Sequence, residues 1–234
     1  MAVGVEVVGH IRSDFPTKFG IPRQSGLVEG LRAQVVMEPA YRAAEAFRGL
    51  EGFSHIWLLW EFSASRREGW SPTVRPPRLG GNQRVGVFAS RSPFRPSPIG
   101  LSCVELLGGD LHTAEGPVLT VGGADLLDGT PILDIKPYVP LADCRPQAVG
   151  GFSDAHREDR LAVEFPAGLL EKVPEGLRAA LVGVLEGDPR PAYHQDPSRV
   201  YGLPFGGLEV KFTVAGGVLL VREVGAAREE GHKA

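Results

Sequence analysis

Short apolar runs, each ending at a glycine, a proline or a polar turn, fill most of the first half of the chain. Six such runs lie at residues 3–11, 31–37, 53–62, 84–90, 99–107 and 117–123. Among them only EPAYRAAEAF at 38–47 has the alanine-rich, proline-started pattern of a helix. Because strands and helices do not alternate, the pattern favours a mainly β fold with a closed or nearly closed antiparallel or mixed barrel over a doubly wound sheet.

The composition changes near residue 143, where a polar, turn-rich stretch separates two parts of the chain. Beyond it we predict a strand at 161–165, a helical stretch at 167–186 that Pro174 splits, and strands at 208–214 and 217–224 that meet in a hairpin. The sequence therefore predicts a barrel domain at 1–145, a small α+β domain at 146–226 and a polar tail at 227–234.

Composition argues against several classes of protein. No run approaches the roughly 18 apolar residues of a membrane helix, and the N-terminus lacks the pattern of a signal peptide. Cys103 and Cys144 have no neighbour at metal-ligand spacing, and the six histidines are scattered singly. We expect a cytoplasmic protein with no membrane partner, no disulfide framework and no metal site.

Positive charge is concentrated in one part of an otherwise slightly acidic chain. The formal net charge is −3, yet the stretch from Gly69 to Val104 contains no Asp or Glu. It holds five arginines: Arg75, Arg78, Arg84, Arg91 and Arg95. Phosphate binding depends on local charge, so this stretch can serve an anionic partner such as a nucleic acid. A solvated basic surface is the alternative.

Four irregular segments combine glycine or proline with charged side chains. They are GIPRQSG (20–26), RPPRLGGN (75–82), SRSPFRPSPIG (90–100) and DLLDGTPILDIKPY (125–138). A stiff backbone that presents a charge suits a preorganised binding site. Corners that close a barrel would also need glycine and proline, so composition alone leaves both interpretations open.

Six motifs in fixed order make the chain resemble a known family. GIPRQ, FSHIW, RPPRLGG, FASRSPFRPSPIGLS, DLLDGTPILDIKPY and DPRPAY resemble the TrmO (YaeB or TsaA-like) family of tRNA methyltransferases, over about residues 8–138 and again at 188–193. The resemblance implies a β-barrel enzyme that uses S-adenosyl-L-methionine and acts as a homodimer. Its reaction is the N6-methylation of N6-threonylcarbamoyladenosine at position 37 in the anticodon loop of tRNA, with tRNA-Thr as the expected substrate. No G-x-G-x-x-G motif follows a strand, in agreement with a non-Rossmann cofactor site.

Carried over residue by residue, the resemblance also implies a set of cofactor contacts. These are Pro22, Arg23, Gln24, Ser63, Arg91, Leu101, Asp125, Leu126, Leu127, Asp128, Gly129 and Thr130. Arginine suits the cofactor carboxylate, and a carboxylate suits the ribose diol or the ammonium group. Ser63 is a departure from the family pattern, in which a histidine often follows the FSHIW strand.

Catalysis and substrate binding require further groups. The N6 nitrogen must lose a proton, and Asp128, Asp134, Tyr138 or water are candidate acceptors among which the sequence does not choose. The expected substrate contacts are Arg75, Arg78, Arg84, Arg95, Lys136, Arg190 and Tyr193. Of these, Arg95 or Lys136 would pair with the threonyl carboxylate. His55, on an apolar strand, is expected to make a buried hydrogen bond that holds the barrel geometry.

Three alternatives compete with this interpretation. The chain could be a non-catalytic RNA-binding barrel, although the carboxylates of DLLDGTPILD would then repel RNA. It could be a methyltransferase of the same fold with another acceptor, although the basic stretch favours RNA. A hydrolase is disfavoured because no nucleophile elbow is present.

Overall fold

Six strands of the first half of the chain close into an antiparallel barrel; the sequence predicted the barrel, but strand β8 (Pro131–Pro137) lies in the segment 125–138 that was expected to be irregular. The computed structural model describes residues 4–76, 83–156, 160–191, 194 and 196–227. Around the barrel the strand order is β1-β2-β7-β6-β3-β8. The bounds are β1 Gly9–Arg12, β2 Arg32–Met37, β3 His55–Glu61, β6 Ile99–Thr113, β7 Gly116–Gly122 and β8 Pro131–Pro137. The prediction of a mainly β fold is confirmed.

Apolar side chains that point inward from the strands fill the barrel. On β3, Ile56, Leu58 and Trp60 are buried inside, whereas His55 lies on the outer face and is exposed. The expected buried hydrogen bond of His55 is therefore wrong; its Nδ1 lies 2.9 Å from Oγ of the neighbouring Ser54 at the exposed edge. Each fully buried aliphatic side chain stabilises the fold by about 1.5–3 kcal/mol, so this interior is the main source of barrel stability.

The segment predicted as a helix at 38–47 forms isolated 3-10 turns instead. These are η1 (Pro39–Tyr41), η2 (Ala44–Phe47) and, farther on, η3 (Leu50–Gly52). Phe47 is the only buried side chain in these three turns, so the segment has no apolar face whose burial could stabilise a longer helix.

Other segments also differ in extent from the prediction, among them the run at 99–107, whose strand β6 continues to Thr113. The run at 3–11 is β-strand only from Gly9 onward. The run at 84–90 forms only the two-residue strand β5 (Val85–Gly86), paired with β4 (Thr73–Val74), and then the turn η6 (Val87–Ala89). The polar stretch after β8 contains the one-turn helix α1 (Pro140–Asp143) and the turn η7 (Gly151–His156). In the first half of the chain, the turn η4 (Ser63–Ser65) follows β3.

The C-terminal part is a small α+β unit, again as predicted. Its sheet has the order β10-β11-β12-β9, with β9 (Ala162–Glu164) parallel to β12 (Val218–Ala226). Strands β10 (Tyr201–Phe205) and β11 (Leu208–Ala215) complete it. Helices α2 (Ala167–Leu170) and α3 (Glu175–Glu186) precede β10, and Pro174 caps α3, where the predicted split lies. Gly216 and Gly217, both at positive φ, form the predicted hairpin turn.

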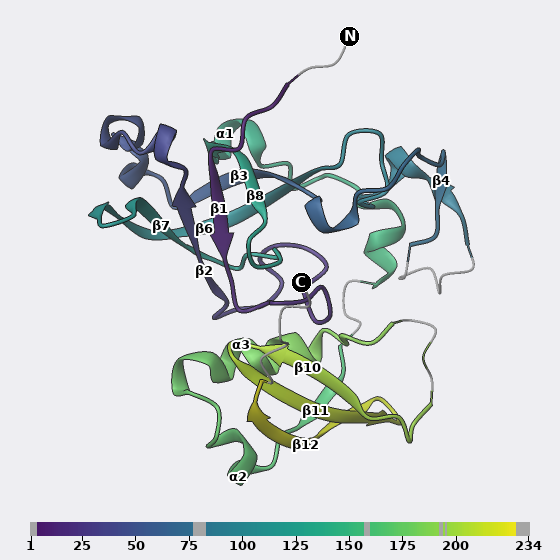
Figure 1. Ribbon diagram of the computed structural model, residues 1–234. Helices are drawn as coiled ribbons and strands as arrows, with labels where there is room; N and C mark the ends of the chain where they lie inside the picture. Colours follow the sequence, from purple (N-terminus) through teal and green to yellow (C-terminus); the bar gives the residue numbers. More distant parts are fainter. Residues whose placement is uncertain (1–3, 77–82, 157–159, 192–193, 195, 228–234) are drawn as a thin grey trace.

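The loop that joins β1 to β2 packs into the C-terminal core. Phe15, 1% exposed, meets Phe205 edge to face at a centroid distance of 5.3 Å, and Val28 and Leu31 belong to the same buried cluster. In Figure 1 this purple segment runs between the barrel above and the C-terminal sheet below. The loop carrying GIPRQSG is therefore held by both halves of the chain.

Replacing Phe15 by alanine tests this anchoring. We expect Phe15→Ala to lower the free energy of unfolding by about 3–5 kcal/mol, because the change leaves a cavity in a closed core. Phe88→Ala is the matched control: Phe88 is 75% exposed, so the effect should stay within about 0.5 kcal/mol. Urea denaturation measures both, and equal midpoints for the two variants would contradict the anchoring.

Candidate functional site

Two loops named by the sequence motifs meet, and the β1–β2 connection that carries one of them also reaches the turn η4 after β3. Arg91, in the arginine-rich loop before β6, donates through Nη1 to Oε1 of Gln24 in the GIPRQSG loop. Lys18, from the same β1–β2 connection, donates to the carbonyl of Ala64 and, at 3.1 Å, to the Ser65 hydroxyl in η4. Segments far apart in sequence thus form one polar cluster.

Asp125 brings the segment DLLDGTPILDIKPY (125–138) into this cluster. Its Oδ1 accepts a 2.6 Å hydrogen bond from the Ser102 hydroxyl on β6, and Ser102 Oγ accepts one of 2.9 Å from Nε1 of Trp60 on β3. Burial raises the pKa of the Asp125 carboxyl, while the Ser102 hydroxyl, the Arg91 charge and a backbone hydrogen bond from Ser25 act to lower it. A partly buried carboxylate beside an arginine is therefore the chemical centre of the cluster.

The rest of the DLLDGT segment is fastened to the turn after β1. The Ser13 hydroxyl donates to the carbonyl of Leu126 at 2.8 Å, and the Ser13 backbone N–H donates to Oδ1 of Asp128 at 2.9 Å. The Thr130 hydroxyl donates to the carbonyl of Leu127 at 2.6 Å. The Asp128 carboxylate thus holds the turn that precedes Phe15.

Two of the candidate proton acceptors lie on the outer face of the barrel. Asp134 on β8 pairs with Nζ of Lys136 at 2.8 Å, so these two predicted site residues offset each other's charge. The backbone N–H of Tyr138 donates to the carbonyl of His55 at the start of β3. The Asp125 carboxylate is hydrogen-bonded to Ser102, which pairs with Leu58, so Tyr138 lies three residues away along β3, or roughly 10 Å.

The remaining predicted cofactor residues are split between the cluster and its surroundings. Pro22 and Gln24 are partly buried in the loop, whereas Arg23 and Ser63 are exposed. Leu101, 47% exposed, points from β6 to the outer face of the barrel, because its neighbour Ser102 points inward. Within one chain, Leu101 and the Asp125 carboxylate therefore lie on opposite faces of the sheet.

The arginines of the basic stretch differ in how far they are engaged. Arg95 is partly buried and donates through Nη1 to the carbonyl of Ser90 at 2.9 Å, which stiffens its own loop. Arg84 donates to the hydroxyl of Thr73 on β4 at 3.2 Å, and Arg75 is exposed. Arg75 and Arg84 therefore present charge to solvent.

The predicted substrate residues of the C-terminal part centre on Arg190. Its Nε and Nη2 bind the two carboxylate oxygens of Asp188 at 2.8 and 2.9 Å, and Asp188 has a positive φ of 51°. Such a two-point pair fixes the plane of the guanidinium group. Tyr193, together with Arg78 of the basic stretch, lies outside the described residues.

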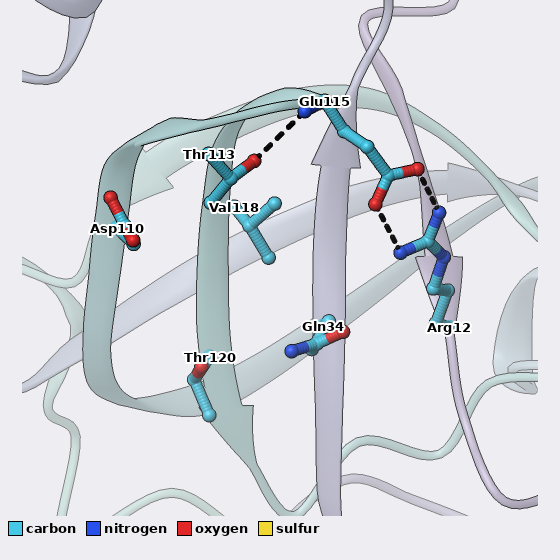
Figure 2. Close-up of a pocket in the computed structure, with 7 residues that line it drawn as sticks. All are labelled: Arg12, Gln34, Asp110, Thr113, Glu115, Val118 and Thr120. Carbon is cyan, nitrogen blue, oxygen red and sulfur yellow. Dashed lines mark hydrogen bonds and ion pairs between the residues drawn. The ribbon is translucent and has the colours of Figure 1, made fainter.

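Two cavities lie apart from the Asp125 cluster. Figure 2 shows the first, of about 280 Å³, on the outer face of the barrel, where the ion pair between Arg12 and Glu115 spans β2. It is lined by Arg12, Gln34, Asp110, Thr113, Glu115, Val118 and Thr120, none of which the sequence motifs include. The second, of about 470 Å³, lies beside Arg190 and the β11–β12 turn. The motif residues therefore favour the loop cluster as the site.

Sequence reasoning did not single out Ser102 and Trp60, which hold Asp125. A signal was present, since Leu101 had been assigned to the site and strand alternation places Ser102 on the other face, inside an otherwise apolar barrel. A polar side chain at such a position needs a hydrogen-bond partner. The identity of that partner depended on the tertiary fold.

Comparisons with known proteins agree with the motifs. A sequence model of the tRNA-methyltransferase O N-terminal domain matches residues 10–144, and one of the TrmO C-terminal domain matches residues 158–227. The chain belongs to the tRNA-methyltransferase O family. Two relatives and one solved structure show how closely it matches other members of that family.

The Escherichia coli tRNA (adenine(37)-N6)-methyltransferase is 46% identical over 81% of this chain and 83% of its own length. A Pseudomonas aeruginosa relative named as an S-adenosylmethionine-dependent methyltransferase is 42% identical over 90% of this chain and 92% of its own. The crystal structure of TrmO from P. aeruginosa superposes with a TM-score of 0.76 at 34% identity, covering 97% of this chain and all of that chain.

The donor set of the cluster fits the cofactor class of this family. Asp125 is a partly buried acceptor suited to a hydroxyl or ammonium group, and Arg91 is an exposed cation suited to a carboxylate. Across the described residues, no group of three or more histidine, cysteine and acidic side chains gathers as a metal site. Within the same residues, no helix is long and apolar enough to span a membrane.

Replacing Asp125 by asparagine tests the electrostatics of the cluster. Burial raises the folded-state pKa of Asp125. Its contribution to the free energy of unfolding is therefore favourable below the unfolded-state pKa and is lost as the pH rises through the folded-state pKa. We therefore expect the melting temperature of Asp125→Asn, measured relative to that of the unsubstituted protein, to increase as the pH rises.

Asp143→Asn gives the opposite case. Backbone and side-chain hydrogen bonds from Val139 and Trp57 lower the pKa of Asp143, so its contribution is lost as the pH falls through the folded value. Thermal melts over a pH series should give slopes of opposite sign for the two variants. Slopes of the same sign would contradict the raised pKa of Asp125.

Proposed function

We propose that the chain methylates N6 of N6-threonylcarbamoyladenosine at position 37 of tRNA, with tRNA-Thr as a substrate and S-adenosyl-L-methionine as the methyl donor. Membership of the family, and 46% identity to a tRNA (adenine(37)-N6)-methyltransferase, make the chain an S-adenosylmethionine-dependent tRNA methyltransferase. The threonylcarbamoyl group is the finer part of the proposal. Its carboxylate is an anionic handle that an arginine in this basic region would recognise.

The observation that carries the proposal is the Asp125–Arg91–Gln24 cluster. The bound cofactor would supply an electrophilic methyl group on sulfur, and this chain's residues would bind and orient it. In the proposed arrangement Arg91 holds the cofactor carboxylate and Asp125 accepts a hydrogen bond from the ribose or the ammonium group. Fixing both ends of the donor orients the methyl group, and orientation can contribute about 7–11 kcal/mol to a two-body reaction.

The RNA would approach from the basic side of the barrel. The exposed Arg75 and Arg84 suit phosphate contacts, and Arg95, Lys136 and Arg190 remain predicted substrate residues. The modified base would leave its stack to reach the cofactor. Asp128, Asp134 and Tyr138 remain the predicted proton acceptors, together with water.

We further propose a cytoplasmic homodimer whose contact face includes α1 and the neighbouring outer surface of the barrel. The Asp143 carboxylate ties α1 to β3 by accepting a 3.0 Å hydrogen bond from Nε1 of Trp57. Leu141 (94%) and Val139 (41%) are exposed on α1 and just before it, and Leu101 (47%) and Ile99 (42%) are exposed farther along the outer face of β6. Exposed apolar side chains of this kind suit a protein contact.

A nucleoside assay tests the proposed reaction. Purified protein, S-adenosyl-L-methionine and tRNA are combined, and the digested nucleosides are analysed by mass spectrometry. We expect a methyl group on threonylcarbamoyladenosine and none on tRNA that carries an unmodified adenosine at position 37. Methylation of both would support the alternative of a different acceptor, and cofactor-independent RNA binding without product would support a non-catalytic RNA-binding barrel.

Within this assay, Arg91→Ala is expected to raise the KM for S-adenosyl-L-methionine by about tenfold or more, because it removes a charge-assisted hydrogen bond. Arg48→Ala is the matched control, since Arg48 is exposed in the β2–β3 connection at the other end of β3. An unchanged KM in Arg91→Ala would remove Arg91 from the cofactor site.

Sedimentation velocity tests the dimer. We expect Leu141→Glu to shift the protein toward monomer, because it places a charge in an apolar contact. Val149→Glu, at a side chain 88% exposed in the linker, should leave the dimer intact. A wild-type protein that sediments as a monomer would contradict this part of the proposal.

A further inference from the structure

A chain of hydrogen bonds runs from the barrel interior to the candidate site. Trp60 donates to Ser102 at 2.9 Å, and Ser102 donates to Asp125 at 2.6 Å. Ser102 is 1% exposed and Trp60 is 8% exposed, so neither hydroxyl nor indole has bulk water as a competing partner. The chain therefore links the closed core to a carboxylate at its edge.

Local geometry brings the indole to the serine. Trp60 on β3 pairs in register with Gly100 on β6, two residues before Ser102. A Cβ atom at Gly100 would lie 2.2 Å from the Trp60 ring. Because glycine leaves that space empty, the ring lies across Gly100 and its N–H reaches the hydroxyl.

The chemistry of the three groups fixes the direction of the hydrogen bonds. An indole N–H can only donate, so Ser102 Oγ must accept from Trp60. The single hydroxyl hydrogen of Ser102 is then directed to Oδ1 of Asp125. A serine that was free to rotate would not impose this orientation.

We propose that Ser102 is a positioning residue, set by Trp60, which fixes the Asp125 carboxylate so that its remaining lone pairs face a hydroxyl or ammonium donor of the cofactor. This inference rests on the proposed function. The short bond to a charged acceptor also stabilises the ionised form, against the burial that raises the pKa of Asp125.

The test uses Ser102→Ala, with Ser54→Ala as the matched control at the exposed edge before β3. Carbon-13 NMR follows the Asp125 carboxyl titration, assigned with Asp125→Asn, and calorimetry follows S-adenosyl-L-methionine binding over the same pH range. We expect Ser102→Ala to raise the titration midpoint by about one pH unit and to weaken binding about tenfold near neutral pH. Ser54→Ala should change neither.

Trp60→Phe provides a second variant in case Ser102→Ala fails to fold. It removes the donor to Ser102 and leaves the Ser102 hydroxyl in place, at the cost of a smaller ring in the barrel interior, so we expect a smaller shift in the same direction. An unchanged Asp125 titration in a folded variant would overturn the inference, as would a shifted titration with unchanged affinity. Absence of binding by the wild-type protein would instead overturn the proposed cofactor, and the titration alone would then decide whether Ser102 controls Asp125.

Discussion

The structure depends on the packing of the β1–β2 loop between the barrel and the C-terminal sheet. A loop that carries glycine and proline gains little order from its own hydrogen bonds, and Phe15, Val28 and Leu31 supply order by burial in the C-terminal core. At the other side, Gly26 donates to the carbonyl of Gly123 and Gly123 donates to that of Leu31, which tie the loop to the end of β7. The position of Gln24, and with it Arg91, follows from this double attachment.

The partly buried Asp125 carboxylate carries an electrostatic cost at this end of the barrel. Its desolvation disfavours the ionised form, and four groups compensate: the Ser102 hydroxyl, the backbone of Asp125 itself, the Arg91 charge and the Ser25 backbone. Few reasons exist to maintain such an arrangement for stability alone, since an apolar residue would fill the same space without that cost. A carboxylate held in this way is ready to bind a hydrogen-bond donor without further reorganisation.

Strand content and fold class followed from the short apolar runs that end at glycine, proline or a polar turn, because runs of this length suit strands that are buried on at least one face. Three of the six motifs supply the loops of the site, although their proximity came from the fold: Gln24, Arg91 and Asp125 come together only after the barrel closes. The predictions that were wrong concern single segments or side chains. Segment 38–47 had helical composition but only Phe47 to bury, and His55 was assigned to the core although alternation places it outside. Tyr138 and Asp134 shared a motif with Asp125, yet strand β8 carries them along the outer face.

A crystal structure with bound S-adenosylhomocysteine would test the central claim most directly. The account predicts ligand density at the end of β3, with the ligand carboxylate against Arg91 and a hydroxyl or ammonium group against Asp125. Ligand density at the Figure 2 cavity or beside Arg190, with the Asp125 cluster unaltered, would contradict it.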